Sequence, residues 1–198
     1  MLCHILRKLI ENLESVYVDK HFDLVVECKK GSKKAHYELY QLYSKAMLNT
    51  AFRIVDNLDE AQDVLQEAFL DAFARIKDFR QETTFGLWIK QIVVHRSINL
   101  LRKRKMELVS IDDEQIENLA DDNFNDDEEI TYKVAQVKEA IKLLPEGYRV
   151  VLSLYLLEGY DHEEIGQILN INENTSRTQF LRAKRKLIEI LKQKGIVA

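Results

Sequence analysis

The chain has 198 residues, 46% of them hydrophobic, with six glycines and one proline, a composition typical of one helix-rich domain or two small ones. No apolar run approaches the ~20 residues needed to cross a bilayer, and Arg7, Lys8 and Glu11 interrupt the N-terminal segment, which excludes a signal-peptide core. Cys3 and Cys28 are too few for a disulfide framework and lack metal-ligand spacing, so we expect a reduced, cytoplasmic protein.

The net charge of −4 conceals an uneven distribution of charge along the chain. Ten acids and no Lys or Arg lie between Asp112 and Glu129, which leaves 23 acids against 29 bases elsewhere, or +6. Residues 106–130 are poor in apolar residues and rich in charge, a composition that predicts an extended or disordered linker in the free chain. An acidic linker therefore joins two mildly basic units.

The first predicted unit spans residues 21–105, after an N-terminal extension, 1–20, of unknown role. It begins with helices around 23–28 and over 33–56. Apolar residues of the second helix are candidate core positions, namely Leu39, Leu42, Tyr43, Ala46, Met47 and Phe52.

A third helix begins near Asp59 and carries two contrasting faces. One is an apolar stripe of Ala61, Leu65, Ala68, Ala72 and Ile76. The other groups acidic and amide side chains around an apolar centre, in Asp63, Gln66, Glu67 and Leu70. Solvation is the usual reason for such a charged face, and docking of a partner protein is the more specific interpretation.

A fourth helix, predicted over 85–105, has a buried side and a polar side. The polar side presents, at three- and four-residue steps, Trp88, Gln91, His95, Asn99 and Arg102. The basic run 102–105 at its end also suits the helix dipole. Basic, amide and aromatic side chains together favour a nucleic-acid surface, next to the polar loop 80–84.

The last predicted unit, 131–198, has four helices, over 132–143, 145–157, 163–169 and a final helix after Asn172. Asp161 can cap the third helix, with Glu164 reaching back to its amide. The final helix buries Phe180, Ala183 and Leu187 and leaves polar and cationic residues outside. This helix-turn-helix over 161–187 is suited to the DNA major groove; a solvated amphipathic helix pair is the alternative.

Four ordered motifs carry a family resemblance: residues 59–69 (DEAQDVLQEAF), 79–89 (FRQETTFGLWI) with the basic end of their helix, 144–151 (LPEGYRVV) and the helix-turn-helix. Together they resemble a bacterial RNA polymerase sigma factor of the sigma-70 family, in the extracytoplasmic-function (ECF) group, over residues 23–191. The resemblance implies an all-α protein in which a region 2 bundle and a region 4 helix-turn-helix are joined by the flexible acidic linker. The linker resembles the segment that threads toward the polymerase active site and the RNA exit path.

The resemblance also implies the role of each surface. The residues expected to bind the polymerase core are Asp59, Asp63, Gln66, Glu67 and Leu70. Those expected to open and bind the −10 element are Arg80, Gln81, Glu82, Thr83, Thr84, Trp88, Gln91, His95, Asn99 and Arg102. Those expected to bind the −35 element are Asn174, Thr175, Arg177, Thr178, Leu181, Arg182, Lys184 and Arg185.

The expected partners are the polymerase core, through its β′ and β subunits, promoter DNA and an anti-sigma factor. The alternative is a helix-turn-helix regulator that acts without polymerase, but the sequence carries no dimerisation signal and that role leaves the acidic helix and the linker unexplained. No constellation of nucleophiles, metal ligands or phosphate-binding glycines points to an enzyme, a metal or a cofactor.

Three residues depart from the family pattern in the recognition helix. Asn174 replaces a common Gly, and Gln179 replaces a frequent Arg. Ser176 stands where a branched apolar residue is usual, so we expect weaker packing of this helix.

Overall fold

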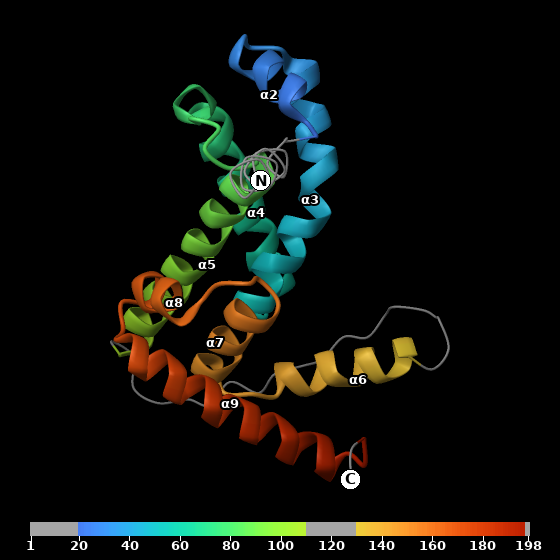
Figure 1. Ribbon diagram of the computed structural model, residues 1–198, viewed down its shortest axis with the longest axis vertical. Coiled ribbons are helices and arrows are strands. Elements are labelled where there is room, and N and C mark those ends of the chain that lie inside the picture. Colours follow the sequence, from blue (N-terminus) through green and yellow to red (C-terminus); the bar gives the residue numbers. More distant parts are fainter. Residues whose placement is uncertain (1–19, 110–129, 197–198) are drawn as a thin grey trace, which may run out of the picture. The chain divides into compact units, whose positions relative to one another are not determined.

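The computed structural model describes the backbone of residues 20–109 and 130–196, and side chains within 20–105 and 136–196. In these described ranges the chain forms helices α2 to α9 and a short 3-10 helix, η2, with no strand (Figure 1). The described residues group into two compact units, one with residues up to Phe52 and Asn57–Ser97, the other with Arg53–Asp56 and the chain from Ile98 onward. The all-α prediction is confirmed.

The four helices predicted for the first part of the chain are all present. They are α2 (Phe22–Lys29), α3 (Lys33–Val55), α4 (Leu58–Ala74) and α5 (Phe85–Val109), with η2 (Ile76–Asp78) between the last two. Asn57 caps α4, because its side chain accepts a hydrogen bond of 3.0 Å from the Glu60 amide. Asp59 and Glu60 lie in the first turn, where their charge complements the helix dipole.

The predicted core of α3 was partly wrong. Leu39 and Met47 are buried, but Leu42 is 49% exposed and Ala46 is exposed too. The buried residues of α3 continue at Thr50, Ala51 and Ile54, one stripe at helical spacing. The sequence pattern suggested a wider apolar face than the neighbouring helices cover, since apolar residues also occur beside the buried stripe.

Aromatic rings fill much of the first unit's core. Phe85 is fully buried and lies 5.3 Å, between ring centroids, from Tyr43 of α3. Phe69 of α4 packs on Tyr40 of α3 at 4.9 Å in an edge-to-face arrangement. Such pairs stabilise a core beyond the area they bury, and they fix the faces that α4 and α5 present to solvent.

The second unit contains the four helices predicted after the linker. They are α6 (Ile130–Lys142), α7 (Glu146–Leu156), α8 (His162–Leu169) and α9 (Glu173–Gln193). Pro145 precedes α7 as its N-cap instead of being its first residue. Buried residues of α6, α7 and α9 form one core. One side of α9 packs into this core, and the opposite side is exposed.

Most of the predicted linker lies outside the described residues, as do residues 1–19 of the extension. The described backbone shows that α5 continues to Val109 and that α6 begins at Ile130, so helix occupies the first residues assigned to the linker. Among the described residues, no helix combines the length and the apolar character needed to span a membrane.

Candidate functional site

Local hydrogen bonds define the helix-turn-helix. The Asp161 side chain accepts from the Glu164 amide at 2.8 Å, and the Glu164 carboxylate accepts from the Asp161 amide at 2.8 Å, so the predicted capping box is confirmed. Asn170, at φ 57°, ends α8 in the left-handed conformation that Asn tolerates. The Asn172 side chain caps α9 by accepting from the Asn174 amide at 2.8 Å. The turn therefore sets where α9 begins.

A glycine allows the turn to pack directly on α8. A Cβ atom placed on Gly166 would lie 2.9 Å from the backbone oxygen of Ile171. Real Cβ atoms do not approach a backbone oxygen so closely, and the turn backbone cannot move aside like a flexible side chain. Gly166 is therefore required by the close approach of α8 and the turn.

Ser176 has a buried partner that the sequence did not indicate. Its hydroxyl oxygen lies 3.0 Å from Nδ1 of His162, and both residues are buried. The His162 ring stacks on Tyr155 at 4.5 Å and meets Phe180 at 5.6 Å. We expected this serine to weaken the packing of α9. Its hydroxyl instead forms a hydrogen bond within an aromatic cluster. A buried polar pair is tolerated when both groups have a hydrogen-bond partner.

Burial lowers the pKa of His162 from its ordinary value of 6.5. The Arg177 guanidinium acts in the same direction, whereas Glu173 and Asp161 oppose it. Taking a proton would place a charge inside the aromatic cluster, which is unfavourable in a medium of low polarity. The pair with Ser176 is therefore formed by the neutral imidazole at neutral pH.

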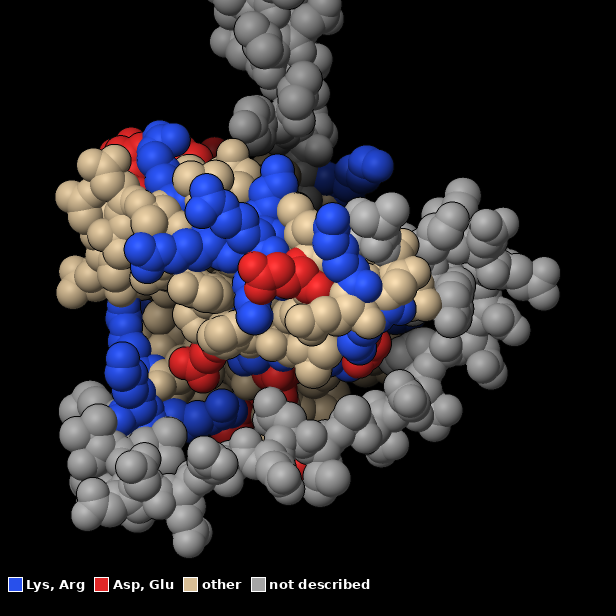
Figure 2. All heavy atoms as spheres, turned by 90° about the horizontal axis from the view of Figure 1, so that it is seen from below, with Lys and Arg blue, Asp and Glu red and all other residues tan. Residues whose placement is uncertain are grey.

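The outer face of α9 is exposed and largely cationic. All eight residues predicted to bind the −35 element are exposed, and Leu181 is 55% exposed among them. Figure 2, the view from below, shows many Lys and Arg side chains at the surface, with acidic side chains among them. Arg177 donates to the Glu173 carboxylate at 3.1 Å, so its guanidinium is held near the start of α9.

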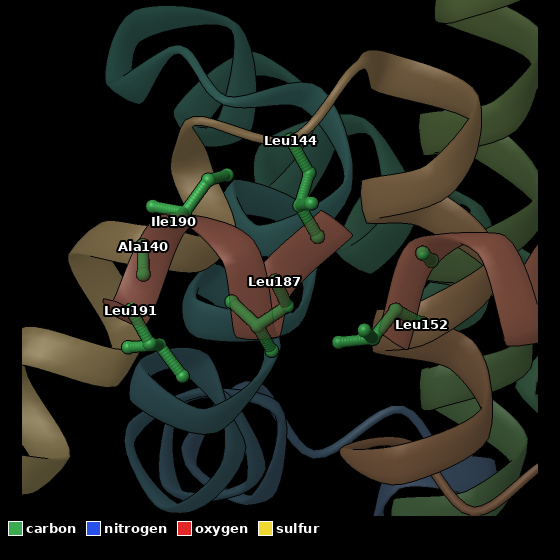
Figure 3. Packing of buried hydrophobic residues seen from close by; sticks show 7 residues of the cluster. Ala140, Leu144, Leu152, Leu187, Ile190 and Leu191 are labelled. Carbon is green, nitrogen blue, oxygen red and sulfur yellow. The ribbon is translucent and has the colours of Figure 1, made fainter. Parts of the chain in front are cut away.

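The opposite side of α9 is anchored by apolar contacts. Leu187, Ile190 and Leu191 of α9 pack with Ala140 of α6 and with Leu152 of α7, as the close view in Figure 3 shows. Full burial of a Leu or Ile side chain stabilises the folded state by ~1.5–3 kcal/mol relative to leaving it exposed. This anchoring leaves the cationic face free of a packing role.

The predicted docking face of α4 is exposed along its length. Asp59, Asp63, Gln66, Glu67 and Leu70 are all exposed, and Leu70 is the most exposed large apolar residue of the described chain at 70%. Behind them, Ala61, Val64, Leu65, Ala68, Phe69 and Ala72 are buried. The face thus combines carboxylates and an apolar centre without any role in the core.

Arg96 of α5, which no sequence motif indicated, forms ion pairs beside this face. Its partners are Glu67 and Asp71 of α4, and its Nε donates to the Asp71 carboxylate at 2.9 Å. Sequence spacing could not indicate this contact, because Arg96 is 25 residues from Asp71. Glu67 is therefore held by α5 while it faces solvent.

The loop before α5 is exposed between two fixed ends. Arg80, Gln81, Glu82 and Thr83 are exposed, and Gln81 adopts φ 62°. Thr84 instead serves α5, because its hydroxyl accepts from the Leu87 amide at 3.3 Å. Thr84 therefore has a structural role as the N-cap of α5.

The polar side of α5 follows the loop. Gln91, His95, Asn99 and Arg102 are exposed at three- and four-residue steps, and Arg102 donates to the Asn99 side chain at 3.3 Å. Trp88, predicted on the same side, is only half exposed. Its ring stacks on Phe79 at 4.9 Å and an interplanar angle of 26°. Eight of the ten predicted −10 residues are therefore exposed, and Thr84 and Trp88 are partly buried.

Two family models match the chain: residues 39–107 match sigma-70 region 2, and residues 135–187 match sigma-70 region 4. The chain is 32% identical to the RNA polymerase sigma factor SigV of Bacillus subtilis over 171 residues, 86% of this chain and 93% of the relative. The chain belongs to the sigma-70 family. It is also 27% identical to the ECF sigma factor SigW of the same organism, over 82% of this chain and 92% of that one, and it is an ECF-group sigma factor.

The fold is also that of a solved sigma factor. The structure of RpoE in complex with the anti-sigma factor NepR, from Bartonella quintana, aligns with a TM-score of 0.58 at 22% identity, covering 79% of this chain and 96% of that one. As an ECF sigma factor, the protein binds RNA polymerase and directs promoter-specific initiation of transcription.

Proposed function

We propose that three exposed surfaces of this sigma factor have separate binding functions. The α4 face binds the polymerase core through the β′ subunit, loop 80–84 and the polar side of α5 open and bind the −10 element, and α9 reads the −35 element. The supporting observation is that nearly all residues of the three sets are exposed and make no part of either core. Region 2 then corresponds to residues 21–105 and region 4 to 131–198, with the β subunit as a second polymerase contact.

Loop 80–84 suits the opening of DNA because capture of an unstacked base requires a polar pocket held in place. Exposed amide, hydroxyl and guanidinium groups can bond the edges of a base, and the cost of unstacking must be offset by such contacts. The neighbouring side chains of α5 can follow the backbone of the separated strand. These features support a role in melting at the −10 element.

The α9 surface suits the major groove of duplex DNA. Arg177 and Thr178 lie near its N-terminal end, where side chains of a recognition helix reach base edges. Lys184 and Arg185 lie farther along, where cations meet phosphates. A regulator that works without polymerase would also use this helix, but it would have no use for the α4 face.

We infer that a separate anti-sigma factor restrains the protein. The solved relative with a similar fold is in complex with such a factor. The relatives are sigma factors, which are not enzymes. We propose that this chain likewise acts without catalytic residues, metal or cofactor. Its proposed location is the cytoplasm, where the polymerase works.

The α4 surface provides the sharpest test. Because Glu67 pairs with Arg96, its reversal would also disturb the contact between α4 and α5, so we choose Asp63→Lys combined with Leu70→Ala. Affinity for core polymerase in the absence of DNA should fall about tenfold or more, as for an interface centre. Binding is measured with labelled sigma factor at equilibrium.

Asp78→Lys is the matched control, because Asp78 is exposed in the same unit but lies in η2. It makes the same change of charge and should leave core binding unchanged. Equal affinity of the double variant and the wild-type protein would show that the polymerase uses another face.

A further inference from the structure

A lysine of α2 reaches the residue immediately before the exposed loop. Lys29 Nζ donates to the backbone oxygen of Phe79 at 2.7 Å, across 50 residues of sequence. The same ammonium lies 5.8 Å from the centroid of the Phe79 ring. One cation therefore holds both the carbonyl and the ring of Phe79 through a charge-assisted hydrogen bond and a cation–π contact.

Phe79 is the point at which loop 80–84 leaves the core. Its amide donates to Ile76 at 3.3 Å and closes η2, and its side chain is buried. Its ring stacks on Trp88 and meets Phe85 edge-on at 6.2 Å. The residues that follow Phe79 are exposed until Thr84, which is fixed as the N-cap of α5. Lys29 thus supplies an anchor at the first end of the loop.

The carbonyl at the end of a short helix has no partner within that helix and needs a donor from elsewhere. Lys29 is the donor here. Without it, the Phe79 carbonyl would lose a hydrogen bond from a charged group, and the stack of Phe79 on Trp88 would lose one of its restraints. A loop that samples more conformations must lose more entropy when it binds a ligand.

We propose that Lys29 is a positioning residue for promoter opening, which holds loop 80–84 and the Phe79–Trp88 stack in the arrangement that binds the −10 element. This inference rests on the proposed role of the loop. Lys29 lies outside the residues that match the region 2 family model, 39–107, so the family match assigns it no role. It acts through Phe79 and does not itself contact the DNA.

Three variants isolate the contact. Lys29→Met keeps an unbranched apolar side chain and removes the donor and the charge, whereas Lys29→Arg keeps a cationic donor. Lys30→Met is the matched control, because Lys30 is exposed and pairs with Glu27 at 2.8 Å. Thermal unfolding of each variant establishes that it is folded.

The first measurement uses the free protein. Trp88 is the only tryptophan of the chain, so its fluorescence reports on the stack with Phe79. We expect Lys29→Met to make Trp88 more accessible to acrylamide quenching, Lys29→Arg to restore protection, and Lys30→Met to match the wild-type protein. Unchanged quenching in Lys29→Met would overturn the positioning role.

The second measurement uses the holoenzyme on a promoter that the wild-type protein selects from a library randomised at the −10 and −35 elements. Lys29→Met should lower open-complex formation about tenfold, as expected for loss of a hydrogen bond to a charged group. It should also broaden the base preference at the −10 element. The preference at −35 and the affinity for core polymerase should stay constant. Unaltered preference at −10, or an equal loss at both elements, would contradict the inference.

A loop variant separates this inference from the function on which it rests. A triple variant combines Arg80→Ala, Gln81→Ala and Thr83→Ala. It should change the base preference at −10 and leave the acrylamide quenching of Trp88 close to that of the wild-type protein. If this triple variant alters preference and Lys29→Met does not, only the role of Lys29 fails. If the triple variant leaves preference unchanged, the proposed function of the loop fails, and the inference fails with it.

Discussion

The two surfaces proposed to bind DNA are held in place by contacts of very different range along the chain. In the helix-turn-helix, the capping box joins residues three apart and the Asn172 cap joins residues two apart. In the first unit, Lys29 of α2 holds Phe79, at the start of loop 80–84, across 50 residues of sequence. One surface is defined mainly by local hydrogen bonds and the other by tertiary contacts.

This difference has a functional counterpart. A recognition helix needs a fixed start and an anchored face, and short-range caps with an apolar core supply both. A loop that captures an unstacked base has no internal hydrogen-bonded repeat to hold it, so packed elements must restrain it from its ends. We therefore expect substitutions in the turn to act on α9 alone, and substitutions in the long-range anchors to act on the loop.

The largest effect is expected at Gly166. Gly166→Ala would push a methyl group against the Ile171 carbonyl, and such overpacking costs ~1–3 kcal/mol of unfolding free energy. The displaced turn should also lower affinity for −35 DNA, while binding to core polymerase, proposed to use α4, should be retained. Urea unfolding and DNA binding measure the two effects.

Gly147→Ala is the control for this change. Gly147 lies in α7, and no atom outside its chain neighbours and the nearby helix backbone lies within 4 Å of a Cβ placed there. The substitution should be neutral or should stabilise the protein by ~0.5–1 kcal/mol, because alanine favours a helix over glycine. Equal free energies of unfolding for the two variants would mean that the close approach of α8 and the turn does not constrain residue 166.

The next effect tests the proposal that some residues of α9 contact bases and others contact phosphates. Arg177→Ala should change preference at one position of the −35 element, with a loss of ~1–3 kcal/mol for the preferred base. Arg185→Ala should weaken binding to all sequences alike and reduce its salt dependence. Competition binding over a randomised −35 library separates these results, and an unchanged preference profile in Arg177→Ala would contradict the assignment.

The smallest effect is the pH dependence that arises from the buried His162. Because its folded pKa is lowered, the unfolded chain binds a proton more readily as the pH falls below about 6.5, and the free energy of unfolding falls with it. His162→Asn removes this titration and can still bond Ser176. Urea unfolding should give a weaker loss of stability between about pH 7 and pH 5.5 in the variant than in the wild-type protein. The same slope in both would assign the dependence to other groups.

The sequence by itself determined the helices and the exposed faces of α4 and α9. Amphipathic spacing located α4 and its acidic face around Leu70, and the cap residues Asp161 and Asn172 located the helix-turn-helix, because both signals act between residues a few positions apart. Motifs in a fixed order then identified the family.

Only the tertiary structure decided which residues support those faces. Lys29, Arg96 and the His162–Ser176 pair leave no periodic or nearest-neighbour signal, since each depends on which helices pack together. For the same reason, the sequence marked Leu42 and Ala46 as core residues, although the structure leaves both exposed. Spacing along one helix gives the direction of a side chain, whereas its burial and its partner depend on the elements brought beside it by the fold.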